Sequence, residues 1–324
     1  MRRRELMLML GAMAVPNALR AQQKTLPVIG FLGGFAPSMS AVIELEQAAF
    51  RQGLSEAGFV EGQNVTIEYH RGEGHLDRLP ALAADLVARK VDVIVTQGGD
   101  PATSAAQQAT STIPILFHTI NDPVAAGFVA SLARPGGNLT GVSLMFAELM
   151  PKRLELLLEV VPQAKVIGLL ANPDELSTER VLANVQEAAR AKRVDLHILK
   201  ALTESEIDGA FATLVQLQAD GLVLGPTGFR PQIAALALRH AVPAIAPQRD
   251  FPDVGGLLSY GASNTAAYHL KGIYTGRILK GEKPSDLPVE QPTTFQLVVN
   301  LKTAETLGLK VPPSILARAD EVIE

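Results

Sequence analysis

An internal repeat is the feature that most constrains the fold of this chain. Three short apolar segments of the first half return in the same order, at similar spacing, in the second half. The pairs are residues 28–32 with 166–170, 91–95 with 219–223, and 113–116 with 242–245. Two copies of one α/β unit within 324 residues predict two lobes, each able to bury its own core. A cleft between two such lobes is where a ligand would bind.

Short β-rich runs alternate with longer helical ones after residue 22. Strands are expected at 28–32, 65–69, 91–96, 113–117, 166–170, 196–199, 221–224 and 243–246. Helices are expected at 38–57, 76–89, 101–109, 124–133, 151–160, 177–192 and 204–218. Alternating strands and helices are typical of a parallel sheet covered on both faces. The sequence therefore predicts two similar doubly wound parallel-sheet lobes.

The last 70 or so residues do not begin a third unit. A strand over 257–260, a helix over 264–280 and a strand over 295–300 suggest that the tail crosses between the lobes again. A multi-strand hinge would result. The expected lobes are residues 27–141 with about 260–288, and 142–259 with about 289–324. The alternative is a C-terminal extension packed on the second lobe alone.

The N-terminus has the pattern of an export signal. Three arginines at positions 2–4 precede an apolar run over 6–15, and Ala21 is a plausible cleavage point. The arginines also loosely fit a twin-arginine signal, so that route of export is an option. Leu19 departs from the small residue preferred there. A basic, disordered extension or an uncleaved anchor remains the alternative to a signal over residues 1–21.

Net charge and amino-acid composition limit the classes of partner expected for the protein. The whole chain carries a net charge of −4, and removing residues 1–21, with four arginines and one glutamate, leaves −7. An acidic protein repels phosphate backbones, so no nucleic-acid partner is expected. Cysteine is absent, which excludes disulfides and thiol chemistry and is compatible with the periplasm. The protein is expected to be a periplasmic monomer.

Signatures of catalysis are missing from the sequence. The glycines near residues 30–34 and 97–99 lack dinucleotide-binding spacing, and no phosphate-binding P-loop or nucleophile elbow occurs. His70, His75 and Asp77 could bind a metal in principle, but a solvated loop is the simpler interpretation. No catalytic residue, metal or cofactor is therefore predicted.

Two loops of the first repeat are candidate ligand contacts. Open parallel sheets bind ligands beyond the carboxyl ends of their strands, where helix N-termini also point. Residues 33–38 and 97–104 occupy such positions, and each loop has glycines followed by a proline and hydroxyl side chains. Backbone amides there, with Thr103 or Ser104, could hold a carboxylate. Ordinary helix capping by Asp100 is the alternative.

Matching loops in the second repeat would form the opposite wall. They cover residues 171–174, 225–228 and 247–249. Aromatic side chains near this edge could pack on a ligand or belong to the core; they are Phe35, Phe229, Phe251 and Tyr260. Arg249 is the candidate for binding an anionic group, with an ordinary surface role as the alternative.

Several segments resemble the periplasmic substrate-binding proteins of ABC importers, in the group that includes tryptophan-type binding proteins. They are residues 2–5, Ala109-Thr110 with Ile113-Pro114, residues 121–124, 132–141 and 317–321. The segment Arg134-Pro135-Gly136-Gly137-Asn138 is the most specific of them. The resemblance covers nearly the whole chain after the signal and implies a type I-like two-lobed protein that delivers a small solute to a membrane permease.

The resemblance also implies a set of ligand contacts by place in the repeat. With the loop analysis, the predicted set is Phe35, Ser38, Gly98, Gly99, Thr103, Ser104, Asn172, Thr227, Phe251 and Tyr260. The solute is not named by the sequence, and an amino acid or a small organic acid is expected. Two alternatives stay open: an enzyme acting at the same cleft, and a ligand-sensing domain of a receptor or regulator.

Overall fold

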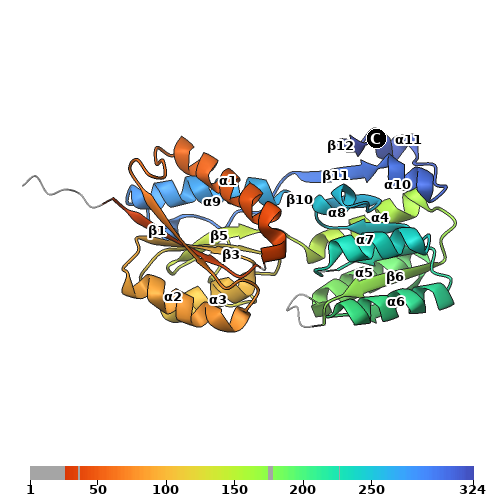
Figure 1. Ribbon diagram of the computed structural model, residues 1–324, viewed down its shortest axis with the longest axis horizontal. Helices are drawn as coiled ribbons and strands as arrows, with labels where there is room; N and C mark the ends of the chain where they lie inside the picture. The colour runs from red at the N-terminus through yellow and green to blue at the C-terminus, as the bar shows by residue number, and fades with distance from the viewer. Residues whose placement is uncertain (1–25, 36, 174–177, 226) are drawn as a thin grey trace, which may run out of the picture.

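The computed structural model describes residues 26–324 except 36, 174–177 and 226, so the predicted signal over residues 1–21 lies outside the described residues. Two lobes lie side by side, each built on a sheet with helices on both faces (Figure 1). No helix in the described part of the chain is long and apolar enough to cross a membrane.

The N-terminal lobe contains a five-stranded parallel sheet in the order β2-β1-β3-β4-β5. Its strands are β1 (Val28–Gly33), β2 (Thr66–Arg71), β3 (Val93–Gln97), β4 (Ile115–Thr119) and β5 (Leu139–Ser143). The sequence did not predict β5, because residues 139–143 mix a glycine and two hydroxyl residues with only two apolar ones. All five are nevertheless buried, and β5 pairs in parallel with β4. The expected lobe boundary after residue 141 falls inside this strand.

The C-terminal lobe contains a seven-stranded sheet in the order β12-β11-β10-β9-β8-β6-β7. Its strands are β6 (Val166–Ala171), β7 (Asp195–Lys200), β8 (Gly221–Leu224), β9 (Ala244–Ala246), β10 (Leu258–Ala262), β11 (Phe295–Asn300) and β12 (Glu321–Ile323). Only the β10–β11 pair is antiparallel. The order β7-β6-β8-β9-β10 repeats that of the first sheet, so the predicted two-lobed α/β fold is confirmed.

Helices cover both faces of the N-terminal sheet. They are α1 (Ser40–Glu56), α2 (Leu79–Ala88), α3 (Asp100–Ala109) and α9 (Asn264–Leu279), with short 3-10 turns at Pro37–Met39, Leu76–Arg78 and Pro284–Asp286. Side chains of α2 and α3 build one core with the sheet, and those of α1 and α9 build the other. Burial of apolar side chains against the sheet on both faces stabilises this sandwich.

The C-terminal sheet is covered in the same way. Its helices are α4 (Met150–Val160), α5 (Thr178–Lys192), α6 (Glu204–Gln216), α7 (Arg230–Arg239), α8 (Asp250–Asp253), α10 (Leu301–Thr306) and α11 (Pro313–Leu316), with a 3-10 turn at Ala147–Leu149. One core contains α4, α5 and the C-terminal helices, and the other contains α6, α7 and Phe251 of α8.

Helix α9 belongs to the N-terminal lobe although it follows the whole C-terminal repeat. It packs on α1 at very short range, because Gly53 and Gly272 face the partner helix. A Cβ atom on Gly53 would lie 1.9 Å from the His269 carbonyl oxygen, and one on Gly272 would lie 2.1 Å from that of Phe50. Only glycine permits this approach, so the two helices form one tightly packed layer.

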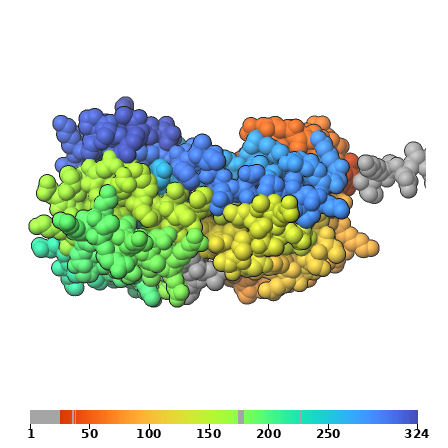
Figure 2. Space-filling model, turned by 180° about the vertical axis from the view of Figure 1, so that it is seen from behind, coloured from red at the N-terminus to blue at the C-terminus, as the bar shows by residue number. Residues whose placement is uncertain are grey.

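The chain crosses between the lobes three times: after β5, after β10, and between Leu287 and β11. The first and third crossings are hydrogen-bonded to each other, since Ser143 N donates to Glu290 O and Glu290 N donates to Gly141 O, both at 2.9 Å. Figure 2 shows the blue C-terminal part of the chain lying across both lobes. The first and third crossings therefore run side by side.

One predicted helix is wrong. Residues 124–133 form turns rather than a helix. The Asp122 carboxylate caps the amide of Val124 at 2.9 Å, and one turn follows. Gly127 then adopts a left-handed φ of 73°, which ends the turn and places Phe128 in the core. The apolar spacing therefore reflected a buried turn rather than a helical face.

Candidate functional site

Loops at the carboxyl ends of the strands meet at the boundary between the lobes. Arg180, near the start of α5 in the C-terminal lobe, contacts Asp122, which follows β4 in the N-terminal lobe, with 3.3 Å between Nη1 and Oδ2. The Arg180 Nη2 atom also lies 2.6 Å from Glu148 Oε1. The pair with Asp122 brings the carboxyl edge of the first sheet against the start of α5.

Three of the predicted contacts meet in the N-terminal lobe. Gly98 and Gly99 follow β3 with φ values of 95° and 84°, which favour glycine. A Cβ atom on Gly98 would lie 3.2 Å from the Phe35 amide nitrogen, so the loops after β1 and β3 touch. Phe35 is half-buried beside them, whereas the side chain of Ser38 lies outside the described residues. Ser104 is half-buried in the first turns of α3.

Thr103 and Phe251 lie in the interior, with exposed fractions of 0%. The Thr103 hydroxyl is 3.0 Å from that of Thr96 and also bonds the Gly99 carbonyl oxygen. Phe251 packs in the core beneath α6 and α7. Both side chains therefore stabilise the structure around the loops, and neither presents a surface to a ligand in this conformation. For Phe251 this is the core alternative that the sequence left open. The capping alternative for the loop before α3 is not observed, because no side chain caps this helix.

The remaining predicted contacts belong to the C-terminal lobe. Asn172 follows β6, Thr227 follows β8 and Tyr260 lies in β10, and all three are half-buried. The Tyr260 ring packs near Phe295, with 6.0 Å between centroids. Its carbonyl oxygen accepts a hydrogen bond from Arg153 Nε at 2.7 Å, which fixes β10 to α4 at the hinge.

Arg249 is engaged elsewhere. Its guanidinium pairs with Glu321 of the edge strand β12, with 2.5 Å between Nη2 and Oε1, and with Asp253 at 3.0 Å. β12 lies at the outer edge of the C-terminal sheet. The predicted anion contact is therefore an ion-pair partner that ties α8 to the end of the chain. Phe229, by contrast, is 41% exposed at the start of α7.

Sequence analysis missed a buried polar network beneath the Gly98 loop. Gln97 Nε2 donates to Glu46 Oε2 at 2.8 Å, and Lys271 Nζ donates to the Thr96 carbonyl oxygen at 2.6 Å. The Tyr268 hydroxyl is 3.2 Å from His118 Nδ1. A signal was available, because Glu46 occupies a core position of its helix, between Ile43 and Phe50.

Burial perturbs every ionisable member of this network. It raises the pKa of Glu46, and contacts with Gln97 and the positive charge of Lys271 partly offset the effect. It lowers the pKa of Lys271 to about 7 against the opposing attraction of Glu46. Burial and the nearby Lys271 also lower the pKa of His118 well below its usual range, which favours the neutral imidazole.

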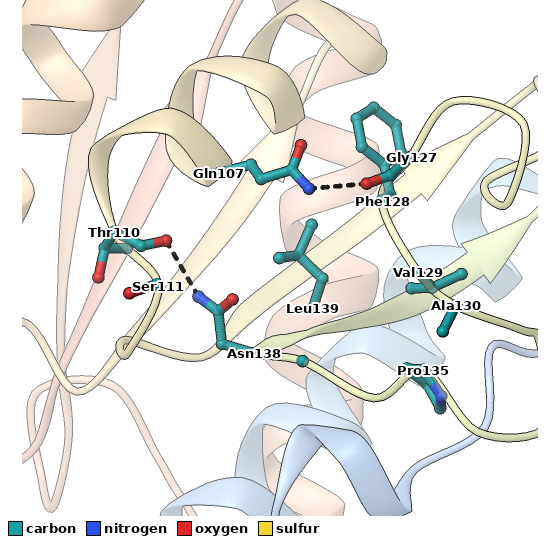
Figure 3. A pocket seen from close by; sticks show the side chains of 11 residues that line it. Gln107, Thr110, Ser111, Gly127, Phe128, Val129, Ala130, Pro135, Asn138 and Leu139 are labelled. Carbon is teal, nitrogen blue, oxygen red and sulfur yellow. Dashed lines mark hydrogen bonds between the residues drawn. The ribbon is translucent and has the colours of Figure 1, made fainter.

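A separate surface pocket of about 420 Å³ lies at the opposite, amino-terminal edge of the first sheet (Figure 3). Its walls come from the end of α3, the turn around Phe128 and the residues that lead into β5. Asn138 Nδ2 donates to the carbonyl oxygens of Ile113 at 2.7 Å and Thr110 at 3.2 Å. The most specific segment of the sequence resemblance therefore shapes a turn and lies away from the predicted ligand loops.

Metal ligands do not gather in the described ranges: no group of three or more His, Asp or Glu side chains could hold an ion there. His70, which the sequence offered with His75 and Asp77 as a possible metal ligand, lies near two carboxylates instead, with 3.7 Å to Glu68 and 3.6 Å to Asp85.

Comparison with known proteins agrees with this architecture. The model of the ABC transporter substrate-binding protein family matches residues 38–323. A tyrosine-binding protein of Clostridioides difficile (strain R20291) is 26% identical over 274 residues, which are 83% of this chain and 78% of the relative. The structure of the ABC domain of Streptococcus pneumoniae in complex with L-Trp is 26% identical and superposes with a TM-score of 0.82 over 92% of this chain and all of that one.

A ligand-free, open substrate-binding protein with adhesive properties from Clostridium difficile is also 26% identical. It superposes with a TM-score of 0.72, over 92% of this chain and 99% of that one. This TM-score is lower than that of the L-Trp complex, although the sequence identity and the coverage of this chain are the same.

Proposed function

The chain belongs to the ABC transporter substrate-binding protein family, and we propose that it captures a small solute between its lobes for an importer. An amino acid is the first candidate, because the relatives include a tyrosine-binding protein and an L-Trp complex. The proposal places the protein in the periplasm after removal of residues 1–21. There it would act as a monomer and hand its solute to a membrane permease.

The proposal rests mainly on one arrangement: three crossings of the chain form a hinge between the lobes, and the Arg180–Asp122 ion pair joins the lobes at their boundary. Bending about the crossings would separate Arg180 from Asp122, and closing would restore their contact. A solute that touches both lobes binds the closed form more tightly than the open one, and this difference in affinity drives closure. The chemistry needed is recognition alone, with no bond made or broken.

The loops predicted to contact the solute offer groups that could bind it. The N-terminal lobe offers the backbone around Gly98 and Gly99 and the ring of Phe35. The C-terminal lobe offers Asn172, Thr227 and Tyr260, which are half-buried and so retain accessible surface. An aromatic ring on one wall and amide or hydroxyl groups on the other match a solute with an apolar part and polar termini.

A thermal-shift screen of the protein purified from the periplasm tests this function. Ligand at about 100 times its Kd stabilises the native state by about 2.7 kcal/mol, so Tm should rise by about 4 °C. The screen covers the twenty standard L-amino acids and a set of small organic acids. X-ray scattering should then show a smaller radius of gyration with the bound solute than without it.

Two results would contradict the proposal. One is chemical turnover of the solute that binds, measured by following its concentration in the presence of the protein. The other is saturable binding with no change in the scattering profile at any solute concentration, because capture by closure requires the lobes to move.

A further inference from the structure

Two polar side chains at the carboxyl edge of the first sheet have buried acceptor atoms without hydrogen-bond donors. Asp100 is the first residue of α3, and Asn121 follows the neighbouring strand β4. Asn121 Nδ2 donates to Asp100 Oδ2 at 2.5 Å. The other carboxylate oxygen of Asp100 and the single side-chain oxygen of Asn121, both Oδ1, are buried without a hydrogen-bond partner in the described structure. Two unpaired acceptors therefore lie on one hydrogen-bonded pair.

The pair is built into the protein rather than lying loosely on its surface. Asp100 is 7% exposed and Asn121 is 8% exposed. The Asn121 amide nitrogen donates to Thr119 Oγ1 at 2.9 Å, and its carbonyl oxygen accepts from Ser143 Oγ at 3.3 Å. The backbone is thus fixed on both sides, and the side-chain orientation follows because only the NH₂ of Asn121 can donate to a carboxylate.

No cation of the described chain pairs with Asp100. Arg180, which contacts Asp122 beside this pair, is bound instead to Asp122 and Glu148. Burial raises the pKa of Asp100, and the Thr119 hydroxyl and Asn121 amide only partly offset it. A buried carboxylate whose donors, Thr119 and Asn121, are both neutral costs free energy that an incoming positive charge would recover.

The position of the pair indicates what kind of cation fits. Asp122 follows Asn121 directly and contacts the opposite lobe, so the pair lies beside the interlobe boundary. The backbone amides of Gly99, Asp100 and Ala102 precede the first intrahelical bond of α3, which Thr103 donates to Gly99 O. Such amides favour a carboxylate. Acceptors for a cation therefore lie next to donors for an anion.

We infer that Asp100 and Asn121 form the subsite for the primary ammonium group of an α-amino acid, whose carboxylate is held by the amides at the start of α3. A primary ammonium has three donors and can satisfy Oδ1 of both residues at once. The inference rests on the proposed function and narrows its solute class, because an organic acid without an amino group leaves both acceptors unpaired. Selection then follows from the penalty for burying an unpaired polar group.

Calorimetric titration tests the subsite. The probe is whichever of the twenty standard L-amino acids binds the full-length exported protein most tightly, together with the same acid carrying hydrogen in place of its amino group. The wild-type protein should bind the amino acid about 100-fold more tightly than the deaminated acid. Asp100→Asn should weaken binding of the amino acid about 100-fold and that of the deaminated acid less than about 5-fold.

The preference for the amino group should therefore shrink in Asp100→Asn, and this coupling distinguishes ligand contact from a structural role. Glu204→Gln is the matched control, since it removes a carboxylate from an exposed first turn of α6 in the other lobe and should leave both affinities unchanged. The Tm of ligand-free Asp100→Asn should equal or exceed that of the wild type, because the variant removes an unpaired buried charge.

Equal affinity of the wild-type protein for the two probes, or an equal loss of both in Asp100→Asn, would overturn the subsite. So would binding of none of the twenty amino acids. If another solute then binds and closes the lobes, the proposed capture function stands without the ammonium subsite, whereas absence of any solute-driven closure removes the function itself.

Discussion

The two lobes have the same strand order but different chemistry at the carboxyl ends of equivalent strands. Pairing with β1 and β6 makes Thr96 and Gln97 of β3 the counterparts of Leu224 and Gly225. In the neighbouring strand, His118 corresponds to Pro247. The N-terminal positions hold a buried polar network, and the C-terminal ones are apolar or lack a side chain. The duplicated backbone has thus kept its core, while at these equivalent positions only the N-terminal copy carries buried polar side chains.

This difference indicates that the two lobes have unequal roles in the proposed capture. The N-terminal lobe holds its glycine loop on a rigid base, through Gln97, Lys271 and Tyr268, and places Asp100 and Asn121 beside it. The C-terminal lobe offers half-buried side chains on loops that rest on an apolar core. One lobe is therefore suited to orient a solute, and the other to cover it.

The largest expected effect concerns Lys271, the buried cation of the N-terminal lobe. Lys271→Met removes the donor to Thr96 O and leaves the buried Glu46 without its nearby positive charge. We expect a loss of about 3 kcal/mol in unfolding free energy, measured by urea denaturation. Arg249→Met, which breaks the exposed pair with Glu321 in the other lobe, should cost less than about 1 kcal/mol.

Adding Glu46→Gln to Lys271→Met should recover about 1–2 kcal/mol, because glutamine keeps an acceptor for Gln97 without a buried charge. A double variant as unstable as the single one would mean that the charge of Glu46 does not matter. Similar losses for Lys271→Met and Arg249→Met would remove the energetic contrast between the lobes.

The pH dependence of stability should come from the N-terminal lobe. Lys271 has a folded pKa of about 7, far below its value in the unfolded chain, so between pH 7 and pH 10 the unfolded state binds more protons. Stability therefore rises with pH in this window, by at most about 1.4 kcal/mol per pH unit. Urea denaturation at pH 7, 8 and 9 measures the slope, and Lys271→Met should abolish it. Retention of the full slope in the variant would assign it to other groups.

The smallest effect is expected at the contact between the lobes. Arg180→Ala removes pairs whose side chains are 35–50% exposed, and such pairs contribute about 0–1 kcal/mol. Solute affinity should fall by no more than about 5-fold, with a slightly larger radius of gyration in the ligand-free state. Arg190→Ala, on the exposed side of the same helix, is the control. A loss above about 100-fold would indicate direct contact between Arg180 and the solute.

Sequence patterns predicted the sheets better than the site. The apolar runs 28–32 and 166–170 became equivalent strands because a continuous apolar run is what a strand buried on both faces requires. The same reasoning failed at residues 139–143, where the hydroxyl of Thr140 is satisfied by the third crossing: Thr140 Oγ1 donates to Leu287 O at 2.7 Å. Leu287 is far from Thr140 in the sequence, so no local pattern could predict this hydrogen bond.

Loop position likewise predicted where Gly98, Gly99 and Phe35 would meet, but residue type misjudged individual side chains. Thr103 and Phe251 were read as contacts from their place near strand ends, and both point into the interior. The direction of a side chain at a helix start depends on how the helix packs on its sheet. Periodicity over one or two turns does not resolve that.

From the sequence alone came the two α/β repeats, the succession of strands and helices along the chain, and the edge of each sheet where loops would gather. These follow from local periodicity and from the geometry of parallel strands. Only the tertiary structure decided which polar side chains meet there. Glu46 reaches Lys271 because α9 returns across the hinge onto α1, and Asp100 reaches Asn121 because β3 and β4 are neighbours. Burial of the surrounding apolar faces brings together residues that are this distant in sequence. The sequence of either segment alone does not specify which other segment it packs against.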